Sequence, residues 1–242
     1  MRKIIIAVCF LGSVSSCQSQ NWGNVLKQAN DVLSSAKGGL TTEEISKGLK
    51  EALTVGIKNS SSQASALDGY LGNQTIKLLF PPEARKVEEK LRQIGLGSQC
   101  DKFITALNRG AEKAAGQAVP IFVDAITKMT IQDALGILKG DKDAATQYLK
   151  KTSTEALTNA FSPIMDEAIN STGATKLYGD IATTYNKIPF VGQKVNPDLK
   201  GYATQKAIDG LFLLVAQEEQ KIRENPAARV TDLLKKVFGS NQ

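Results

Sequence analysis

Histidine is absent from the 242 residues of this chain. Its absence excludes Ser-His-Asp and Cys-His catalytic arrangements, in which an imidazole takes a proton from the nucleophile. It also excludes zinc sites with His ligands and iron sites built from two His and one carboxylate. Any catalysis would therefore depend on carboxylate, Lys or Tyr side chains, or on a bound cofactor.

Cysteine is also scarce, and two of the three cysteines, Cys9 and Cys17, lie close to the start of the chain. Two cations precede an apolar run over residues 4–11, and small residues follow up to Cys17. This order is typical of a secretory signal. The sequence V-S-S-C resembles the lipobox of bacterial lipoproteins, in which the cysteine is lipidated and becomes the first mature residue. We therefore expect a signal peptide over residues 1–16 and a lipid anchor on Cys17.

The alternative is that the apolar run begins a buried helix, with Cys9 and Cys17 as small core residues. A membrane-spanning helix would need about 20 apolar residues, more than this run contains. After processing, Cys100 would be the one remaining unmodified thiol, so no intramolecular disulfide is expected. Because no His is present to activate it, Cys100 is more typical of a helix-packing residue than of a nucleophile.

The lipobox resemblance also indicates a location. In a Gram-negative cell, Asp after the lipidated cysteine retains a lipoprotein in the inner membrane, so Gln18 favours the outer membrane, facing the periplasm. The polar residues 17–23 would then form a tether between the lipid and the domain.

The charge balance indicates a partner class only weakly. The chain has 30 basic and 24 acidic residues, and removal of Arg2 and Lys3 with the signal peptide lowers the excess by two. The cations are spread along the chain rather than interleaved with aromatics, so nucleic acid is not an expected partner. A mild positive excess suits docking on an anionic envelope lipid or polymer.

Apolar residues recur at helical spacing from residue 24 onward, and no long Pro- or Ser-rich linker interrupts them. We expect a single all-α domain over residues 24–242, with about nine helices. One segment departs from this pattern: residues 75–80 read T-I-K-L-L-F after two glycines. The prediction for this segment is a buried hydrophobic strap, with a short strand as the alternative.

Several helix boundaries carry recognisable signals. Capping-box spacing occurs at Thr41 with Glu44 and at Thr130 with Asp133, and Gly140 ends the second of these helices. We expect Pro120 to kink or restart the Ala-rich segment over residues 99–128. Further helices are expected to begin after Asn24, at Pro82, after Asp141 or Asp143, before the stripe at 157–169 with its bend near Pro163, near Leu177, and at the Asn-Pro pairs 196–197 and 225–226.

Four long segments carry a family resemblance: NRGAEKAAGQAVPIF, TIQDALGILKGDKDAATQYLKKT, DLKGYATQKAIDGLF and EEQKIRENPAARVTDLLKKVFG. Together they resemble domain of unknown function 4197, an uncharacterised bacterial family of exported helical proteins. The resemblance implies a bacterial envelope protein, and it implies no assigned activity.

Six polar residues are candidates for a pocket between central helices. The carboxylates stand out because helical bundles that bind metal hold it with carboxylates on facing helices. The candidates are Asn108, Glu112, Tyr148, Asp209, Glu219 and Arg223. The structural alternative is that Glu219 and Arg223 form an ordinary helix ion pair, and that Asp209 caps or bonds a neighbouring helix end. No catalytic residue, metal or cofactor is assigned.

The favoured function is a non-catalytic binding or structural module that is anchored to a bacterial envelope membrane through Cys17. Its partner would be an envelope protein, a polymer or a hydrophobic ligand bound between helices. The alternative is a carboxylate-dependent envelope enzyme, directed at glycan or dependent on metal, that uses Glu112, Asp209 and Glu219.

Overall fold

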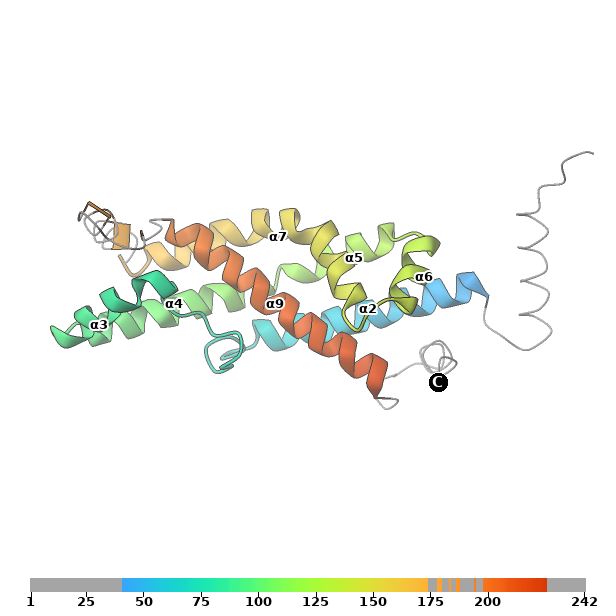
Figure 1. The fold of residues 1–242 in the computed structure, drawn as a ribbon, viewed down its shortest axis with the longest axis horizontal. Helices are drawn as coiled ribbons and strands as arrows, with labels where there is room; N and C mark the ends of the chain where they lie inside the picture. Colours follow the sequence, from blue (N-terminus) through green and yellow to red (C-terminus); the bar gives the residue numbers. More distant parts are fainter. Residues whose placement is uncertain are drawn as a thin grey trace, which may run out of the picture. The chain divides into compact units, whose positions relative to one another are not determined.

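The computed structural model describes residues 41–173, 178–179, 183, 186–187, 194 and 198–225. These residues form seven α-helices and one 3-10 turn, and no strand occurs among them, which confirms the all-α class. The helices are α2 (Thr42–Ser65), η1 (Pro82–Ala84), α3 (Arg85–Gln93), α4 (Gly97–Ala115), α5 (Ala118–Lys128), α6 (Ile131–Lys139), α7 (Ala144–Asn170) and α9 (Leu199–Glu224) (Figure 1).

The predicted count of about nine helices stays a prediction, because three of the expected helices lie wholly or mostly outside the described residues. They are the helix capped by Asn24, the helix near Leu177 and the helix after Pro226. The signal peptide over residues 1–16 and the tether over 17–23 also lie outside the described residues.

The short helix α6 follows its sequence signals at both ends. The Thr130 hydroxyl accepts from the Asp133 backbone N–H at 3.1 Å, and the Asp133 carboxylate accepts from the Thr130 backbone N–H at 3.0 Å. This reciprocal capping box satisfies two backbone donors that the helix start would otherwise leave without partners. Gly140 is the C-cap residue, as predicted.

Pro120 restarts the Ala-rich segment rather than kinking it. α4 ends at Ala115, and α5 begins at Ala118, which places Pro120 in the first turn of α5. A proline is tolerated there because the first-turn N–H groups have no partner within the helix.

The two helices expected over residues 144–169 are one helix in the structure, which corrects that prediction. α7 is continuous over 27 residues and contains Pro163. The intervening Thr-rich stretch stays helical because its hydroxyls donate to carbonyls one turn back. Thr152 bonds to Tyr148 at 2.8 Å, and Thr154 bonds to Lys150 at 2.6 Å.

α9 begins two residues later than the Asn-Pro pair 196–197 predicted. Its N-cap is Asp198, whose carboxylate accepts from the Gly201 backbone N–H at 2.8 Å. The short carboxylate side chain is well suited to this position, since it reaches the free N–H groups of the first turn.

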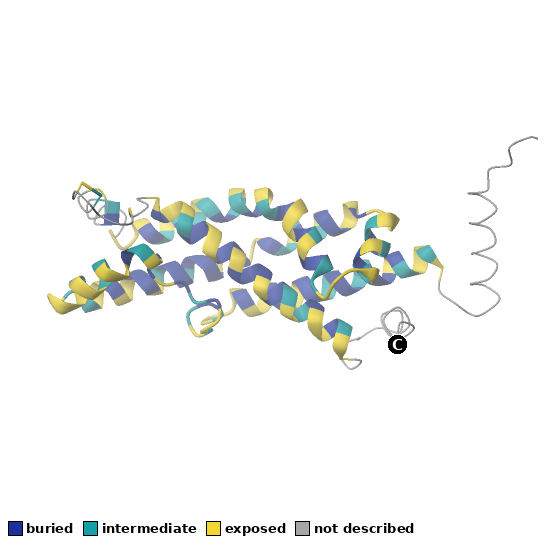
Figure 2. Cartoon of the chain, in the orientation of Figure 1, coloured by how far each residue is buried: buried dark blue, intermediate teal, exposed yellow. Residues whose placement is uncertain are grey.

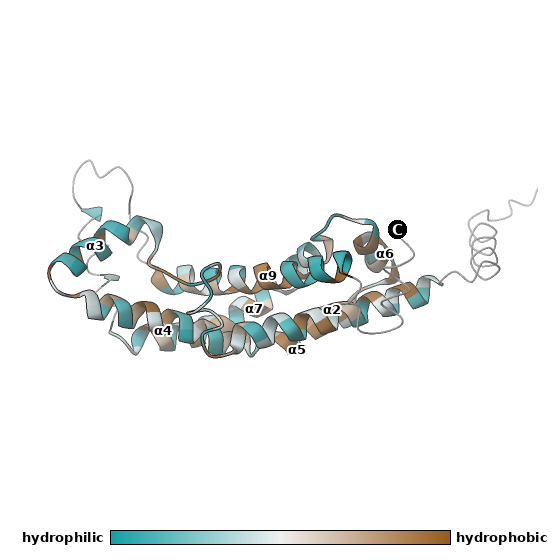
Figure 3. Ribbon diagram, turned by 90° about the horizontal axis from the view of Figure 1, so that it is seen from below, coloured by the Kyte–Doolittle hydropathy of each residue, from teal (hydrophilic) through white to brown (hydrophobic). Residues whose placement is uncertain are grey.

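The core lies between α2, α4, α7 and α9. α9 packs against both α7 and α2, and α4 packs against α7 (Figure 1). Buried residues run along these helices (Figure 2), and each helix carries hydrophilic residues on its other positions (Figure 3). The largest fully buried side chains include Tyr70, Phe122, Phe161, Phe212, Leu107 and Leu157.

α4 and α7 approach each other closely at Gly110. A Cβ atom at this position would lie 2.6 Å from the Ala168 Cβ and 3.3 Å from the Met165 sulfur. Such a contact is shorter than van der Waals packing allows, so the approach depends on the missing side chain.

Residues 66–81, which we call the strap, connect α2 to η1 without helix or strand. Within the predicted segment, residues 75–80, Ile76, Leu78 and Phe80 are buried, whereas Leu79 is exposed. Asp68 has a φ of 63°, a left-handed conformation that Asp adopts more readily than most residues.

Within the described part of the chain, no helix is both long enough and apolar enough to cross a membrane.

Candidate functional site

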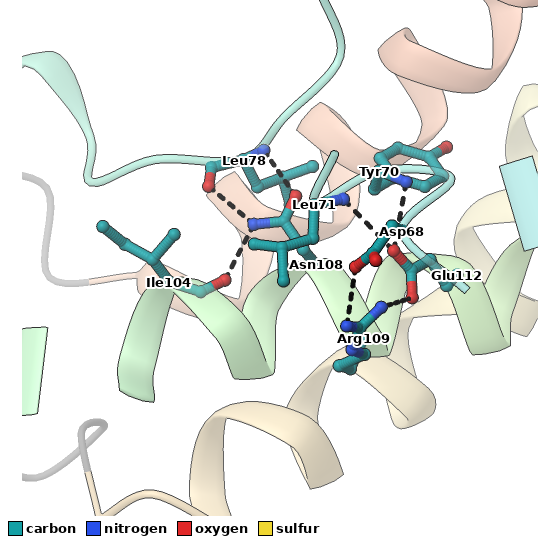
Figure 4. A network of polar contacts seen from close by, with 8 residues as sticks. All are labelled: Asp68, Tyr70, Leu71, Leu78, Ile104, Asn108, Arg109 and Glu112. Carbon is teal, nitrogen blue, oxygen red and sulfur yellow. Dashed lines mark hydrogen bonds and ion pairs between the residues drawn. The ribbon is translucent and has the colours of Figure 1, made fainter. Parts of the chain in front are cut away.

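Glu112 of α4 binds the backbone of the strap. One carboxylate oxygen accepts from the backbone N–H groups of Tyr70 and Leu71, both at 3.1 Å. The other oxygen accepts from Arg109 at 2.6 Å, and Arg109 also pairs with Asp68 at 2.7 Å (Figure 4). The Glu112 side chain is only 6% exposed, so these bonds replace nearly all of its hydration.

Asn108 binds the strap one turn earlier on α4. Its carbonyl accepts from the Leu78 N–H at 2.8 Å, and its amide donates to the Leu78 carbonyl at 2.8 Å. The amide also donates to the Ile104 carbonyl at 2.7 Å (Figure 4). The fully buried amide therefore satisfies both backbone groups of Leu78, which lies in a segment without helix or strand bonds.

The strap also packs onto α9. The Tyr70 ring is fully buried, and its hydroxyl donates to the Ala207 carbonyl at 2.7 Å. Burial, with the nearby Glu112 carboxylate, raises the pKa of Tyr70 above its usual range. Gly210 makes room for this ring, because a Cβ atom there would lie 2.9 Å from it. Asn108, Arg109 and Glu112, which we call the α4 cluster, thus hold the strap in place.

Glu219 of α9 caps the start of α7. Its carboxylate accepts from the backbone N–H groups of Ala145 and Thr146 at 3.0 and 2.9 Å. The Thr146 hydroxyl adds a bond of 2.8 Å, and Arg223 pairs with the same carboxylate at 2.8 Å. Asp143, the N-cap residue of α7, makes no side-chain cap bond. A carboxylate from another helix therefore performs the capping, aided by the positive end of the helix dipole.

Arg223 links this cap to a second helix end. Its guanidinium also donates to the carbonyl of Ile137, near the end of α6, at 2.9 Å. Glu219 and Arg223, which we call the α9 cluster, thereby join α6, α7 and α9.

The six candidate residues do not form one pocket. Asn108 and Glu112 lie in the α4 cluster, whereas Glu219 and Arg223 lie in the α9 cluster. The strap meets α9 at Ala207, and Glu219 is twelve residues farther along, a helix rise of about 18 Å.

The other two candidates lie outside both clusters. Asp209 is exposed and bonds to Gln205 at 2.9 Å on the surface of α9. Tyr148 is half-buried, and burial, with the Asp133 carboxylate, raises its pKa.

Glu112 and Glu219, the two carboxylates that are buried among the described residues, already accept hydrogen bonds from the fold itself. Each accepts from two backbone N–H groups and pairs with an arginine. A carboxylate whose oxygens already accept these bonds is poorly placed to transfer a proton to a substrate or to bind a metal. Among the described residues, no three His, Cys, Asp or Glu side chains are grouped closely enough to hold a metal ion.

A cavity of about 180 Å³ lies between α3, the first half of α4 and the residues that follow α7. Its wall is mainly apolar, and the residues used below are Phe80, Val87, Leu91, Cys100, Phe103 and Tyr178. The rings of Phe80 and Phe103 contact each other, with centroids 4.6 Å apart.

Two titratable groups line this cavity. Cys100 is 2% exposed, as expected of a packing residue, and burial raises the pKa of its thiol. Burial is also the main cause that raises the pKa of Tyr178 to about 12. Both groups are therefore neutral at physiological pH, which keeps the wall uncharged.

Helical spacing alone does not reveal this cavity. Val87 and Leu91 are four residues apart in α3, and Phe103 is three residues after Cys100 in α4, spacings that are typical of inward-facing positions. Helical spacing indicates that such residues face inward, but it does not indicate how completely the facing surfaces fill the space between them.

A family model described as a protein of unknown function, DUF4197, matches residues 39–239. The chain belongs to this family. No curated protein and no solved structure gives a significant match. The matched residues of this DUF4197 chain include the strap, the α4 cluster, the α9 cluster and the cavity, so all four features lie within the family domain.

Proposed function

We propose that this DUF4197 protein is a non-catalytic binding module, held on a bacterial envelope membrane by a lipid on Cys17, that takes up a hydrophobic ligand. The observation that carries the binding role is the apolar cavity beside α3. Ligand sites in proteins are typically concave and mainly apolar, with a few polar groups at the edge.

The occupied carboxylates support a non-catalytic role. Glu112 and Glu219 each hold backbone groups of another segment, and they belong to separate clusters. An enzyme that uses paired carboxylates needs both groups on one substrate, so this geometry gives the enzymatic alternative no support.

The anchoring part of the proposal rests on the sequence before the domain. A charged start, an apolar run and V-S-S-C are the features that favour lipidation of Cys17. One lipid chain gives only marginal membrane binding, so stable anchoring requires more than one chain at this cysteine or an additional contact.

Membrane fractionation of a bacterial host that expresses the full chain tests the anchor. Cys17→Ala is expected to move the protein from the membrane to the soluble fraction. Cys9→Ala is the matched control, because Cys9 leaves with the signal peptide and the mature protein should stay on the membrane. Cys17→Ala protein that remains in the membrane fraction would contradict the anchor.

Native mass spectrometry of protein purified from the envelope tests the binding role. A co-purified organic mass supports uptake of a hydrophobic ligand. A protein that purifies without ligand and binds no amphiphile when titrated would contradict the binding role.

A further inference from the structure

The cavity beside α3 is large enough for a compact apolar group. An engineered cavity of about 150 Å³ lined by Leu, Ile and Phe stays dry and binds benzene. This cavity is somewhat larger, at about 180 Å³, and its wall combines two phenyl rings with aliphatic side chains and the Cys100 thiol. It suits a ring or the end of an alkyl chain of about six carbons.

A polar groove on the surface of α4 adjoins the cavity. Gln99 and Thr172 line both the cavity and the groove, so the two spaces adjoin. The groove is lined further by Ser98, Asp101 and Lys102. A ligand that fills both spaces needs an apolar end and a polar end, which is the definition of an amphiphile.

Lys102 is the cation in the groove that an anionic head can bind. Arg92 pairs with both Asp101 and Glu88, at 2.8 Å from each, so these three side chains together keep one negative charge. Lys102 forms no ion pair with any residue that the structure describes. Its ammonium group is therefore available to a carboxylate or phosphate in the groove.

The wall formed by α3 makes few buried contacts, and the Arg92–Asp101 ion pair that joins it to α4 is exposed, so this wall provides a path for entry. No residue of α3 is fully buried (Figure 2), and within the described residues α3 packs mainly on α4 and η1. The turn after α3 contains Gly95 with a φ of 88°, and Ile94 beside it is 71% exposed. Elements with few buried contacts open at low free-energy cost, so α3 can move aside for a ligand.

We propose that the cavity binds the apolar end of a single-chain anionic amphiphile, while its head group lies in the adjoining groove beside Lys102. This inference rests on the proposed function and names its ligand class.

Calorimetric titration of the full-length protein with decanoate, below its micelle concentration, tests the site. Val87→Phe places a larger side chain at the cavity wall and is expected to weaken decanoate binding at least about tenfold, the effect of 1.4 kcal/mol. Lys86→Phe is the matched control, because it adds the same ring to the exposed face of α3. The decanoate affinity of the Lys86→Phe variant should equal that of the wild type. Thermal unfolding checks that both variants fold.

The possible results distinguish failure of the cavity as the binding site from failure of the proposed binding function. If Val87→Phe leaves decanoate binding unchanged, the cavity is not the site, but the protein is still a binding module. No binding of any single-chain amphiphile by wild type would overturn both.

The head group is tested with uncharged decanol and with decyl phosphate. Lys102→Gln is expected to weaken decanoate and decyl phosphate binding by about two- to fivefold, the range of an exposed ion pair, and to leave decanol binding unchanged. Lys139→Gln, an exposed lysine on α6, is the control. Equal effects of Lys102→Gln on decanol and decanoate would overturn the anionic head. The tighter of the two anions identifies a carboxylate or a phosphate as the natural head.

Discussion

The two halves of α4 differ in how completely they are packed. The second half carries Leu107, Asn108 and Glu112, all buried and in contact with the strap or the core. The first half carries Cys100 and Phe103, which face a cavity, and its outer cover, α3, has no fully buried residue. We infer that the second half of α4 maintains the fold and that the first half is available for binding.

The largest expected effect is the removal of the Glu112 carboxylate. Glu112→Ala leaves two backbone N–H groups of the strap without partners and Arg109 without its buried anion. The expected loss in the free energy of unfolding is about 2–5 kcal/mol, because each unpaired backbone N–H costs about 1–3 kcal/mol. Urea unfolding followed by circular dichroism measures it.

Glu112→Gln is the matched variant for this test. Both strap N–H groups bind the same carboxylate oxygen, so an amide oxygen can retain them while the ion pair is lost. Its destabilisation should be clearly smaller than that of the alanine variant. Loss of less than about 1 kcal/mol in Glu112→Ala would show that the α4 cluster does not hold the strap.

A Leu-to-Ala truncation beside each half of α4 compares the packing of the two halves directly. Leu107 is fully buried, and Leu107→Ala is expected to cost about 3 kcal/mol. Leu91 is half-buried beside the cavity, and Leu91→Ala is expected to cost less than about 1.5 kcal/mol, because less apolar surface returns to water. Chemical unfolding of both variants measures the difference, and equal losses would contradict the comparison.

An added methyl group at Gly110 tests the close contact between α4 and α7. Gly110→Ala forces a Cβ atom against Ala168 and is expected to cost about 1–3 kcal/mol, despite the better helix propensity of alanine. Ala168→Gly should restore part of this loss in the double variant. Gly136→Ala in α6 is the control: a Cβ atom there meets nothing within 4 Å, so it should gain up to about 1 kcal/mol.

The smallest expected effect concerns the exposed capping box of α6. Thr130→Ala is expected to cost about 1 kcal/mol in thermal or urea unfolding. The Thr130 hydroxyl, followed by its backbone N–H, lowers the pKa of Asp133. Because the folded pKa lies below the unfolded one, this stabilisation is present above the unfolded pKa and is lost as the pH falls through the folded pKa. The difference between wild type and Thr130→Ala should therefore shrink below about pH 4. A constant difference down to pH 2 would contradict the role of Asp133.

Local signals in the sequence predicted the helix boundaries well where the capping partners are neighbours. Thr130, Asp133 and Gly140 define α6 within eleven residues, and Pro120 falls in the first turn of α5. The two helices predicted over residues 144–169 are one, because the Thr hydroxyls between them bond one turn back and keep the backbone helical.

The sequence could not predict the contacts of the candidate site residues, because these contacts join segments that are far apart in the chain. The four-residue spacing of Asn108 and Glu112 predicts that they share a helix face, but their partners at Leu78 and Tyr70 lie 30 and 42 residues away. Glu219 caps a helix that begins more than 70 residues earlier. Helical periodicity determines which residues share a face, whereas the partner of that face depends on tertiary packing.

The most direct test of the account is a methyl-resolved NMR titration of the full-length protein with decanoate. The account predicts shifts for the methyl groups of Val87, Leu91 and Leu96, which line the cavity, and none for Leu107 or Leu157 in the core. Shifts at Leu107 and Leu157 without shifts at Val87 and Leu91, or no shifts at saturating decanoate, would contradict the assignment of binding to the first half of α4.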